Sequence, residues 1–263
     1  IAPKGFKPKK VESESEEDLL ASPAHNVRFQ GFEKLRKGGT SSLPLIKKLL
    51  NSDTPWLAGR ALWLLPYLGE QGIAELNKIL CTIGENDYRY RATALRSALR
   101  YDRENLGWSM MDKLKNDKSA HVRRIILTHL RDFPYSKKRG VLLDLVLSGD
   151  MKDRTYLEAV GLAADGDEDS LWTDYCKVRK ISNANDWDRQ AHLLAWRLHG
   201  DSMIEDMVAR MLMTEVSPEH RKELVASLAM NRTEAAFNGM KKVYGESEDE
   251  DVKDLAKQFL VKG

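Results

Sequence analysis

The sequence has little of what disulfide frameworks, zinc knuckles and covalent haem sites require. Only two cysteines, Cys81 and Cys176, occur in 263 residues, and neither belongs to a CxxC or CxxCH motif. Their separation excludes a local zinc knuckle, a thioredoxin-type redox pair and haem attachment within this chain. We predict that both side chains are buried thiols.

Long apolar runs and a strong excess of one charge are also lacking. The longest mostly apolar stretches, residues 61–65 and 141–147, are far shorter than the roughly 18 residues that cross a bilayer. The sequence therefore predicts no membrane-spanning segment, and we expect the chain to be part of a larger protein. With 42 Lys and Arg against 40 Asp and Glu, its charge is nearly balanced, which disfavours nucleic acid as a partner.

Catalytic motifs are missing as well. The sequence contains no HExxH, GxSxG, GxGxxG or P-loop pattern. His192 and His199 share one face of a predicted helix, with Asp188 a turn earlier, but the two rings are about 10 Å apart along the axis, too far for one metal ion. We predict no catalytic, cofactor-binding or metal-binding residue, and we do not expect this segment to be an enzyme.

What the chain does have is a repeated segment, in which a polar turn precedes a basic residue that opens an Ala/Leu-rich helix. The repeated basic position is occupied by Arg28, Ala58 as an exception with Arg60 two places on, Arg91, Arg123, Arg154, Arg189, Arg221 and Lys253. A period of about 32 residues with two helices in each unit is typical of stacked helical hairpins, because one hairpin cannot bury its own apolar face.

The second helix of each unit shows apolar residues at spacings of three and four. These second helices are predicted over residues 42–50, 72–81, 104–115, 137–147, 169–180, 202–213 and 233–244. Predicted N-cap residues of the first helices are Ser22, Asp53, Asp87, Ser119, Asp153, Asp186 and Ser217. The fold class predicted for residues 20–263 is all-α, a right-handed α-solenoid of about seven HEAT-like (armadillo-like) helix pairs with a C-terminal capping helix. Residues 1–19, basic and then acidic, are predicted to be a linker leaving a preceding domain.

The repeated arginines favour a structural role. We expect each guanidinium to bond carbonyl groups or an aspartate in the adjacent turn, so that the series forms a ladder along the helices. The alternative is a row of arginines that binds phosphate or carboxylate groups, because successive repeats would place like groups in register.

An interaction surface is predicted on the second helices, which line the concave side of such superhelices. Trp108 falls off the apolar stripe of its helix, and with Lys113 and Lys115 it forms the first candidate patch. Trp172 and Tyr175 raise the same possibility on a later second helix.

The segments that carry a family resemblance are IAPKGFKPK at 1–9, HNVRFQGFEKL at 25–35, DTPWLAGRALWLLPYLG at 53–69, RYRATALRSALR at 89–100 and KDRTYLEAVGLAADG at 152–166. With them the chain resembles the HEAT-repeat region of large PVC-type haem-binding CxxCH proteins, also described as membrane-bound dehydrogenases. The resemblance implies a middle segment between a β-propeller and a cytochrome c domain, in an exported protein that is extracytoplasmic or periplasmic. Because the sequence contains neither propeller nor CxxCH motif, no dehydrogenase or electron-transfer residue carries over to it.

Two classes of function follow. The first is a non-catalytic scaffold or protein-interaction segment whose partners are proteins, among them the flanking domains of the same parent chain. The alternative is a nucleic-acid-binding HEAT-like protein of the alkylpurine DNA glycosylase type, which needs an aspartate and aromatic side chains converging on a flipped base. A small-molecule lyase on such repeats is a third possibility that no distinctive residue supports.

Overall fold

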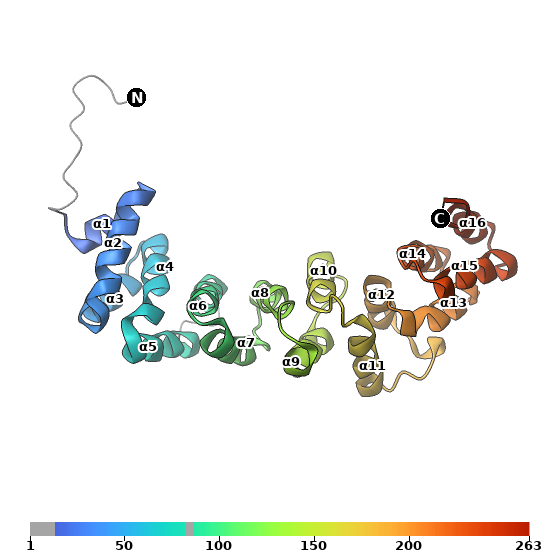
Figure 1. Ribbon diagram of the computed structural model, residues 1–263, viewed down its shortest axis with the longest axis horizontal. Coiled ribbons are helices and arrows are strands. Elements are labelled where there is room, and N and C mark those ends of the chain that lie inside the picture. Colours follow the sequence, from blue (N-terminus) through green and yellow to red (C-terminus); the bar gives the residue numbers. More distant parts are fainter. Residues whose placement is uncertain (1–13, 83–86, 263) are drawn as a thin grey trace, which may run out of the picture. The chain divides into compact units, whose positions relative to one another are not determined.

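The computed structural model describes residues 14–82 and 87–262, and in this range every regular element is a helix and no strand occurs (Figure 1). The predicted all-α class is therefore confirmed. The first helices in chain order are α1 (Glu16–Ala21), α2 (His25–Gly38), α3 (Leu43–Leu50), α4 (Pro55–Leu64), α5 (Gly69–Thr82), α6 (Tyr88–Tyr101) and α7 (Trp108–Leu114). They are followed by α8 (Ala120–Leu130), α9 (Tyr135–Ser148), α10 (Arg154–Ala163), α11 (Glu168–Arg179), α12 (Arg189–Leu198), α13 (Ile204–Leu212), α14 (Pro218–Leu228), α15 (Glu234–Glu246) and α16 (Glu250–Lys262).

The chain divides into two compact units, residues 1–114 and 115–263. In the first unit α1 packs on α2, α2 contacts α4, and α4 contacts α6, while α3 lies against α4 and α5 against α6. The helices α1 and α2 approach closely at Gly31, where a Cβ atom would lie 2.7 Å from the backbone nitrogen of Leu20. Leu19 and Leu20 are buried at this crossing.

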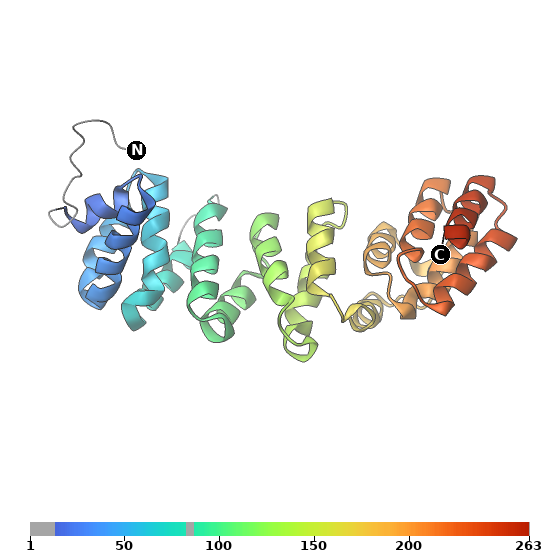
Figure 2. The same ribbon diagram turned by 45° about the horizontal axis from the view of Figure 1, so that its top comes forward.

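The second unit shows a regular alternation of contacts. The even-numbered helices form one series, in which α8 contacts α10, α10 contacts α12, α12 contacts α14 and α14 contacts α16. The odd-numbered helices form another, since α9 contacts α11 and α13 contacts α15. Figures 1 and 2 show these two rows within the unit. Most helices of this unit therefore meet the helix two places on in sequence.

The predicted second helices agree with the structure to within about three residues at most ends, except for the stretch predicted at 104–115. There a π-helical turn, Arg103–Gly107, precedes α7. The turn begins at Asp102, whose side chain accepts a hydrogen bond from the backbone N–H of Asn105 at 3.1 Å. Gly107 lets it pack on α6, because a Cβ atom at this position would lie 2.8 Å from Cδ2 of Leu99.

The start of the helical region differs from the prediction. The predicted linker ends at residue 19, yet α1 begins at Glu16 with Ser15 as its N-cap, and the Ser15 hydroxyl accepts from the backbone N–H of Asp18 at 3.1 Å. The acidic run looks like a solvated linker in the sequence, but its carboxylates suit the first turn of a helix, where the helix dipole favours negative charge. Residues 1–13 of the predicted linker lie outside the described residues.

Among the predicted N-caps, Asp87, Ser119, Asp153 and Ser217 are confirmed. Three predictions were wrong, because α2, α4 and α12 begin later and have Ala24, Thr54 and Asp188 as N-caps. Asp186 instead lies in a short 3-10 helix before α12, where its side chain accepts from the backbone N–H of Ser182 at 2.7 Å.

Candidate functional site

The first predicted patch is divided between the two units, with Trp108 and Lys113 in the first and Lys115 in the second. Trp108 is half-buried at the first residue of α7. Lys113 is exposed and belongs to the first unit, where its Nζ donates to Oδ1 of Asn77 at 2.8 Å. Lys115 belongs to the second unit, and its Nζ pairs with Oδ2 of Asp144 at 2.9 Å.

Trp172 and Tyr175 do not belong to an exposed surface, so this part of the prediction is corrected. Trp172 is 4% exposed and Tyr175 is fully buried. The Trp172 ring stacks on Tyr175 with centroids 5.8 Å apart, and it meets the edge of Trp187 at 5.1 Å. Burial raises the pKa of Tyr175 to about 12. Large aromatic surfaces packed in this way stabilise the core of the second unit.

Three arginines of the second unit, Arg123, Arg189 and Arg197, bridge successive helices of the even-numbered row. Arg123 of α8 lies over the ring of Tyr156 of α10, and Arg197 of α12 pairs with Glu158 of α10 at 2.6 Å. Further along the row, Arg189 of α12 donates two hydrogen bonds to Glu223 of α14, at 2.6 and 3.0 Å. At the repeated position, Arg189 thus meets an acid of the next helix in the row, whereas Arg154 pairs with Glu158 of its own helix.

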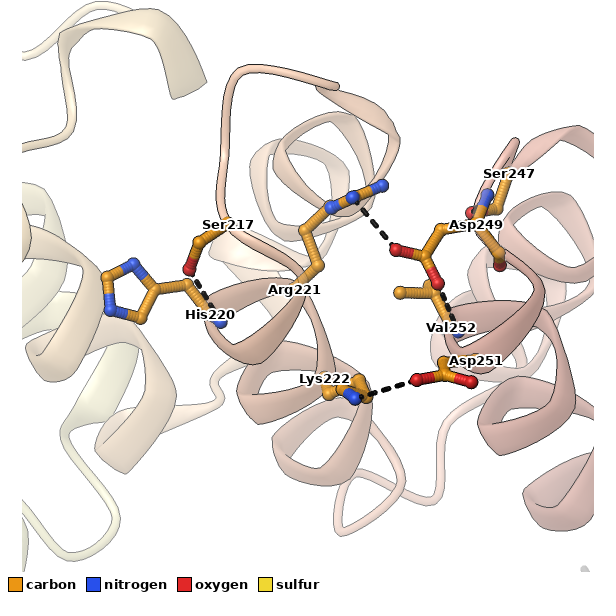
Figure 3. Close-up of polar contacts among 8 residues, drawn as sticks. All are labelled: Ser217, His220, Arg221, Lys222, Ser247, Asp249, Asp251 and Val252. Carbon is orange, nitrogen blue, oxygen red and sulfur yellow. Dashed lines mark hydrogen bonds and ion pairs between the residues drawn. The ribbon is translucent and has the colours of Figure 1, made fainter.

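The last bridge of this row joins α14 to the start of α16 (Figure 3). Arg221 is 7% exposed, and its Nη2 lies 3.0 Å from Oδ2 of Asp249. The second carboxylate oxygen of Asp249 accepts from the backbone N–H of Val252 at 3.1 Å. One carboxylate thus caps α16 and neutralises the arginine of the preceding helix of the row. The neighbouring pair, Lys222 and Asp251 at 3.1 Å, lies at the surface.

Two arginines of the first unit, Arg28 and Arg60, donate to carbonyl oxygens instead. Arg28 of α2 donates from Nη1 to the carbonyl oxygen of Pro23 at 2.7 Å, and Arg60 of α4 donates from Nη1 to that of Leu20 at 2.7 Å. Both Nη1 atoms also lie within hydrogen-bond distance of the Ser22 carbonyl oxygen, at 3.3 and 3.5 Å. Among the described residues, no carboxylate pairs with either guanidinium.

These two arginines border a cavity of about 210 Å³ on the first unit. Its lining residues are Leu20, His25, Arg28, Phe29, Phe32, Arg60 and Trp63. We name it the Arg28–Arg60 cavity. Phe29 is 57% exposed, so an aromatic ring is available at its rim. Its volume lies below the ~300–1,000 Å³ of a drug-sized ligand site and suits one or two side chains.

Electrostatics make the Arg28–Arg60 cavity distinct. Burial and the positive charge of Arg28 lower the pKa of Arg60. The Arg60 guanidinium stays charged near neutral pH and lies over the ring of Trp56, 4.3 Å from its centroid. A larger hollow of about 730 Å³ in the second unit, between α14, α15 and α16, is lined by one cation and one anion, Arg232 and Glu234. The first cavity alone of these two has an uncompensated positive lining.

Among the described residues, no group of three or more His, Cys, Asp or Glu side chains can hold a metal ion. His192 is buried, its Nε2 lies 3.1 Å from Oε2 of Glu223, and burial together with the charge of Arg189 lowers its pKa to about 4. Cys176 is half-buried rather than buried, a correction to the prediction, and burial raises its pKa to about 11. The side chain of Cys81 lies outside the described residues.

Sequence reasoning found the arginines of the Arg28–Arg60 cavity but not the cavity. Arg60 was noted only because it stands two places from the repeated basic position. The available signal is the pair Phe29 and Phe32, whose spacing of three residues puts both rings on one face of α2 beside Arg28.

Among the described helices, none combines the length and the apolar composition of a membrane span. No protein-family model matches this chain, and no curated protein matches it significantly.

Proposed function

We propose that this chain is a HEAT-like helical-repeat scaffold, a right-handed α-solenoid that acts as a non-catalytic protein-interaction segment. The observation that carries the proposal is the series of bridges at the repeated arginine position. Arg123, Arg189 and Arg221 each join one helix of the even-numbered row to the next. Charged side chains engaged in holding neighbouring repeats together are typical of a scaffold, and they are not available for chemistry.

A second repeated contact supports the proposal. Ser97 of α6 and Ser227 of α14 each stand six residues after the repeated arginine, and both are buried. The Ser97 hydroxyl donates to the carbonyl oxygen of Trp63 in α4 at 3.3 Å, and that of Ser227 donates to the carbonyl oxygen of Trp196 in α12 at 2.6 Å. The same sequence position thus makes the same kind of contact in both units, as expected of repeats that stack on neighbours.

The parent protein is part of the proposal. On the resemblance to PVC-type haem-binding CxxCH proteins, we propose that the chain lies between a propeller and a cytochrome c domain of its parent protein, outside the cytoplasm. Its partners are then proteins, first of all the flanking domains of the same chain. A pull-down of the separately expressed flanking domains tests this, and absence of binding at high micromolar concentration contradicts it.

Small-angle X-ray scattering tests the solenoid. A compact chain of 263 residues has a radius of gyration of about 18 Å. Stacked repeats form an elongated array, so we expect a clearly larger radius of gyration and an asymmetric distance distribution. A value near 18 Å for the monomer contradicts the solenoid.

The second candidate is a nucleic-acid-binding protein of the alkylpurine DNA glycosylase type. The Arg28–Arg60 cavity favours it in one respect, since guanidinium groups and aromatic rings suit a phosphate and a base. Its lining contains no carboxylate, however, and a glycosylase needs one. Fluorescence anisotropy with duplex and single-stranded DNA across a salt series separates the two candidates. Salt-sensitive micromolar binding favours the second, and no binding at low salt favours the scaffold.

A further inference from the structure

We propose that the Arg28–Arg60 cavity binds a short acidic segment of a partner protein, in which a carboxylate stands next to an aromatic side chain. This inference rests on the proposed function in one respect, because the occupant is taken to be a protein. It adds a recognition site and the chemistry of its ligand.

The positive charge is the first reason. Both Nη1 atoms approach one acceptor, the Ser22 carbonyl oxygen, so that a single anionic group beside it can reach both guanidinium groups. Each guanidinium carries five N–H donors, and within residues 14–82 and 87–262 the acceptors from these two are main-chain carbonyl oxygens. Donors therefore remain for a ligand. Burial and, after it, the like charge of Arg28 lower the pKa of Arg60, and an anion between the two groups offsets both effects.

The aromatic lining is the second reason. Phe29, Phe32 and Trp63 supply three rings beside the two arginines, and Phe29 is more than half exposed. The ring of Phe32 packs edge-to-face against the ring of Tyr67, with ring centroids 5.7 Å apart. A ligand side chain that packs on these rings loses apolar contact with water, and its neighbouring carboxylate meets the guanidinium groups.

The size and charge of the cavity favour a peptide over nucleic acid. About 210 Å³ accommodates one aromatic side chain with the adjoining carboxylate, not a length of backbone. Nucleic-acid affinity comes from several phosphate contacts spread along a basic surface. Here the arginines of the described lining are Arg28 and Arg60 alone.

The probe is a fluorescein-labelled pentapeptide of alternating glutamate and phenylalanine, with a glutamine-for-glutamate analogue as the charge control. Fluorescence anisotropy at low salt is expected to show binding of the acidic peptide to the full chain. We expect the glutamine analogue to bind at least about tenfold more weakly, since a hydrogen bond to a charged group is worth about 1.5–3 kcal/mol. Equal affinity of the two peptides, or no binding of the acidic one, overturns the proposal.

Variants locate the site. Arg28→Gln and Phe29→Ala are each expected to weaken acidic-peptide binding about five- to tenfold or more. Phe29→Ala keeps the experiment decisive, because removal of an exposed ring leaves folding intact, which a thermal melt checks. Arg36→Gln is the matched control, since Arg36 lies on the same helix, outside the cavity, in a surface pair with Glu33 at 2.8 Å. Unchanged binding by both cavity variants, or equal loss in Arg36→Gln, overturns the assignment.

Competition identifies the chemistry of the occupant. Inorganic phosphate at millimolar concentration is expected to displace the acidic peptide only weakly, because it lacks the aromatic part. Displacement by duplex DNA at lower concentration than unlabelled peptide, with steep salt dependence, overturns the peptide assignment in favour of nucleic acid. The scattering measurement and the pull-down of flanking domains do not depend on this cavity, so their failure is distinguishable from failure here.

Discussion

Two arginines of the second unit are neutralised by carboxylates, whereas two arginines of the first unit donate to carbonyl oxygens. In the second unit Arg189 and Arg221 point at carboxylates of the next helix in the row, so their charges are neutralised within the protein. In the first unit Arg28 and Arg60 donate to carbonyl oxygens, Arg60 also lies over the Trp56 ring, and both arginines border an open aromatic cavity. A repeated arginine therefore has no fixed role. What decides is whether the neighbouring turn supplies an acid.

This difference has an energetic consequence. A buried cation that loses its acid is left with uncompensated charge, which costs several kcal/mol, whereas an arginine with spare donors in an accessible cavity is solvated until a ligand arrives. The comparison predicts large stability effects for ion pairs of the second unit. It predicts small stability effects, together with binding effects, for the lining of the Arg28–Arg60 cavity.

The largest stability effect is expected at Lys138 in α9. This lysine is 1% exposed, and its Nζ pairs with Oδ2 of Asp167, before α11, at 2.8 Å. Asp167→Ala strands a buried ammonium group and is expected to lower the free energy of unfolding by about 4 kcal/mol. Lys138→Met removes the charge but fills the space, and a clearly smaller loss is expected. Urea unfolding measures the free energy of unfolding of both variants. Equal losses would contradict the comparison, because they would show that the Lys138–Asp167 pair is not desolvated.

A somewhat smaller effect is expected at the bridge in Figure 3. Arg221→Ala leaves Asp249 without its cation and weakens the docking of α16 on α14, so we expect a loss of about 2–3 kcal/mol. Lys222→Ala is the control on the same helix. Its partner Asp251 has a side chain that is 76% exposed, and surface pairs contribute about 0.2–1 kcal/mol. If both variants lose the same stability by urea unfolding, burial does not distinguish the two pairs.

Acid is expected to weaken the second unit through His192. The pKa of His192 in the folded protein is about 4, below the ordinary value near 6.5, because the ring is buried and lies beside Arg189. The neighbouring His220 also lowers this pKa, whereas Glu223 raises it. The unfolded chain therefore binds a proton first as pH falls, and stability is lost between about pH 6.5 and pH 4, by up to about 3 kcal/mol. Urea unfolding of His192→Gln over this range should show a smaller decline than wild type. An identical decline would assign the acid sensitivity to other groups.

Much of the helical arrangement could be predicted from the sequence, because apolar spacing of three and four marks each buried face. The second helix at α9, predicted over 137–147, is observed as Tyr135–Ser148. Errors occurred where one residue type suits two structures. Acidic residues before Leu19 suit both a solvated linker and the first turn of a helix, and only burial of Leu19 and Leu20 against Gly31 decides between them.

The candidate site was less predictable, because it depends on contacts between segments far apart in the sequence. Arg60 reaches the carbonyl oxygen of Leu20, forty residues earlier, and no local pattern encodes that contact. Trp172 and Tyr175 show the opposite case. Their position on a second helix predicts an exposed surface for both, but Trp187, from the segment before α12, packs on Trp172.

The smallest stability effect is expected at the rim of the Arg28–Arg60 cavity, and it sharpens the comparison most directly. Phe29 is 57% exposed, so Phe29→Ala removes little buried surface and should change the free energy of unfolding by less than about 0.5 kcal/mol. Leu35→Ala on the same helix is the matched control, because Leu35 is 2% exposed and its loss is expected to cost about 2–4 kcal/mol. Urea unfolding of both variants separates a side chain kept for packing from one available for binding. A large loss in Phe29→Ala would make the ring part of the core and remove the aromatic half of the argument for a ligand.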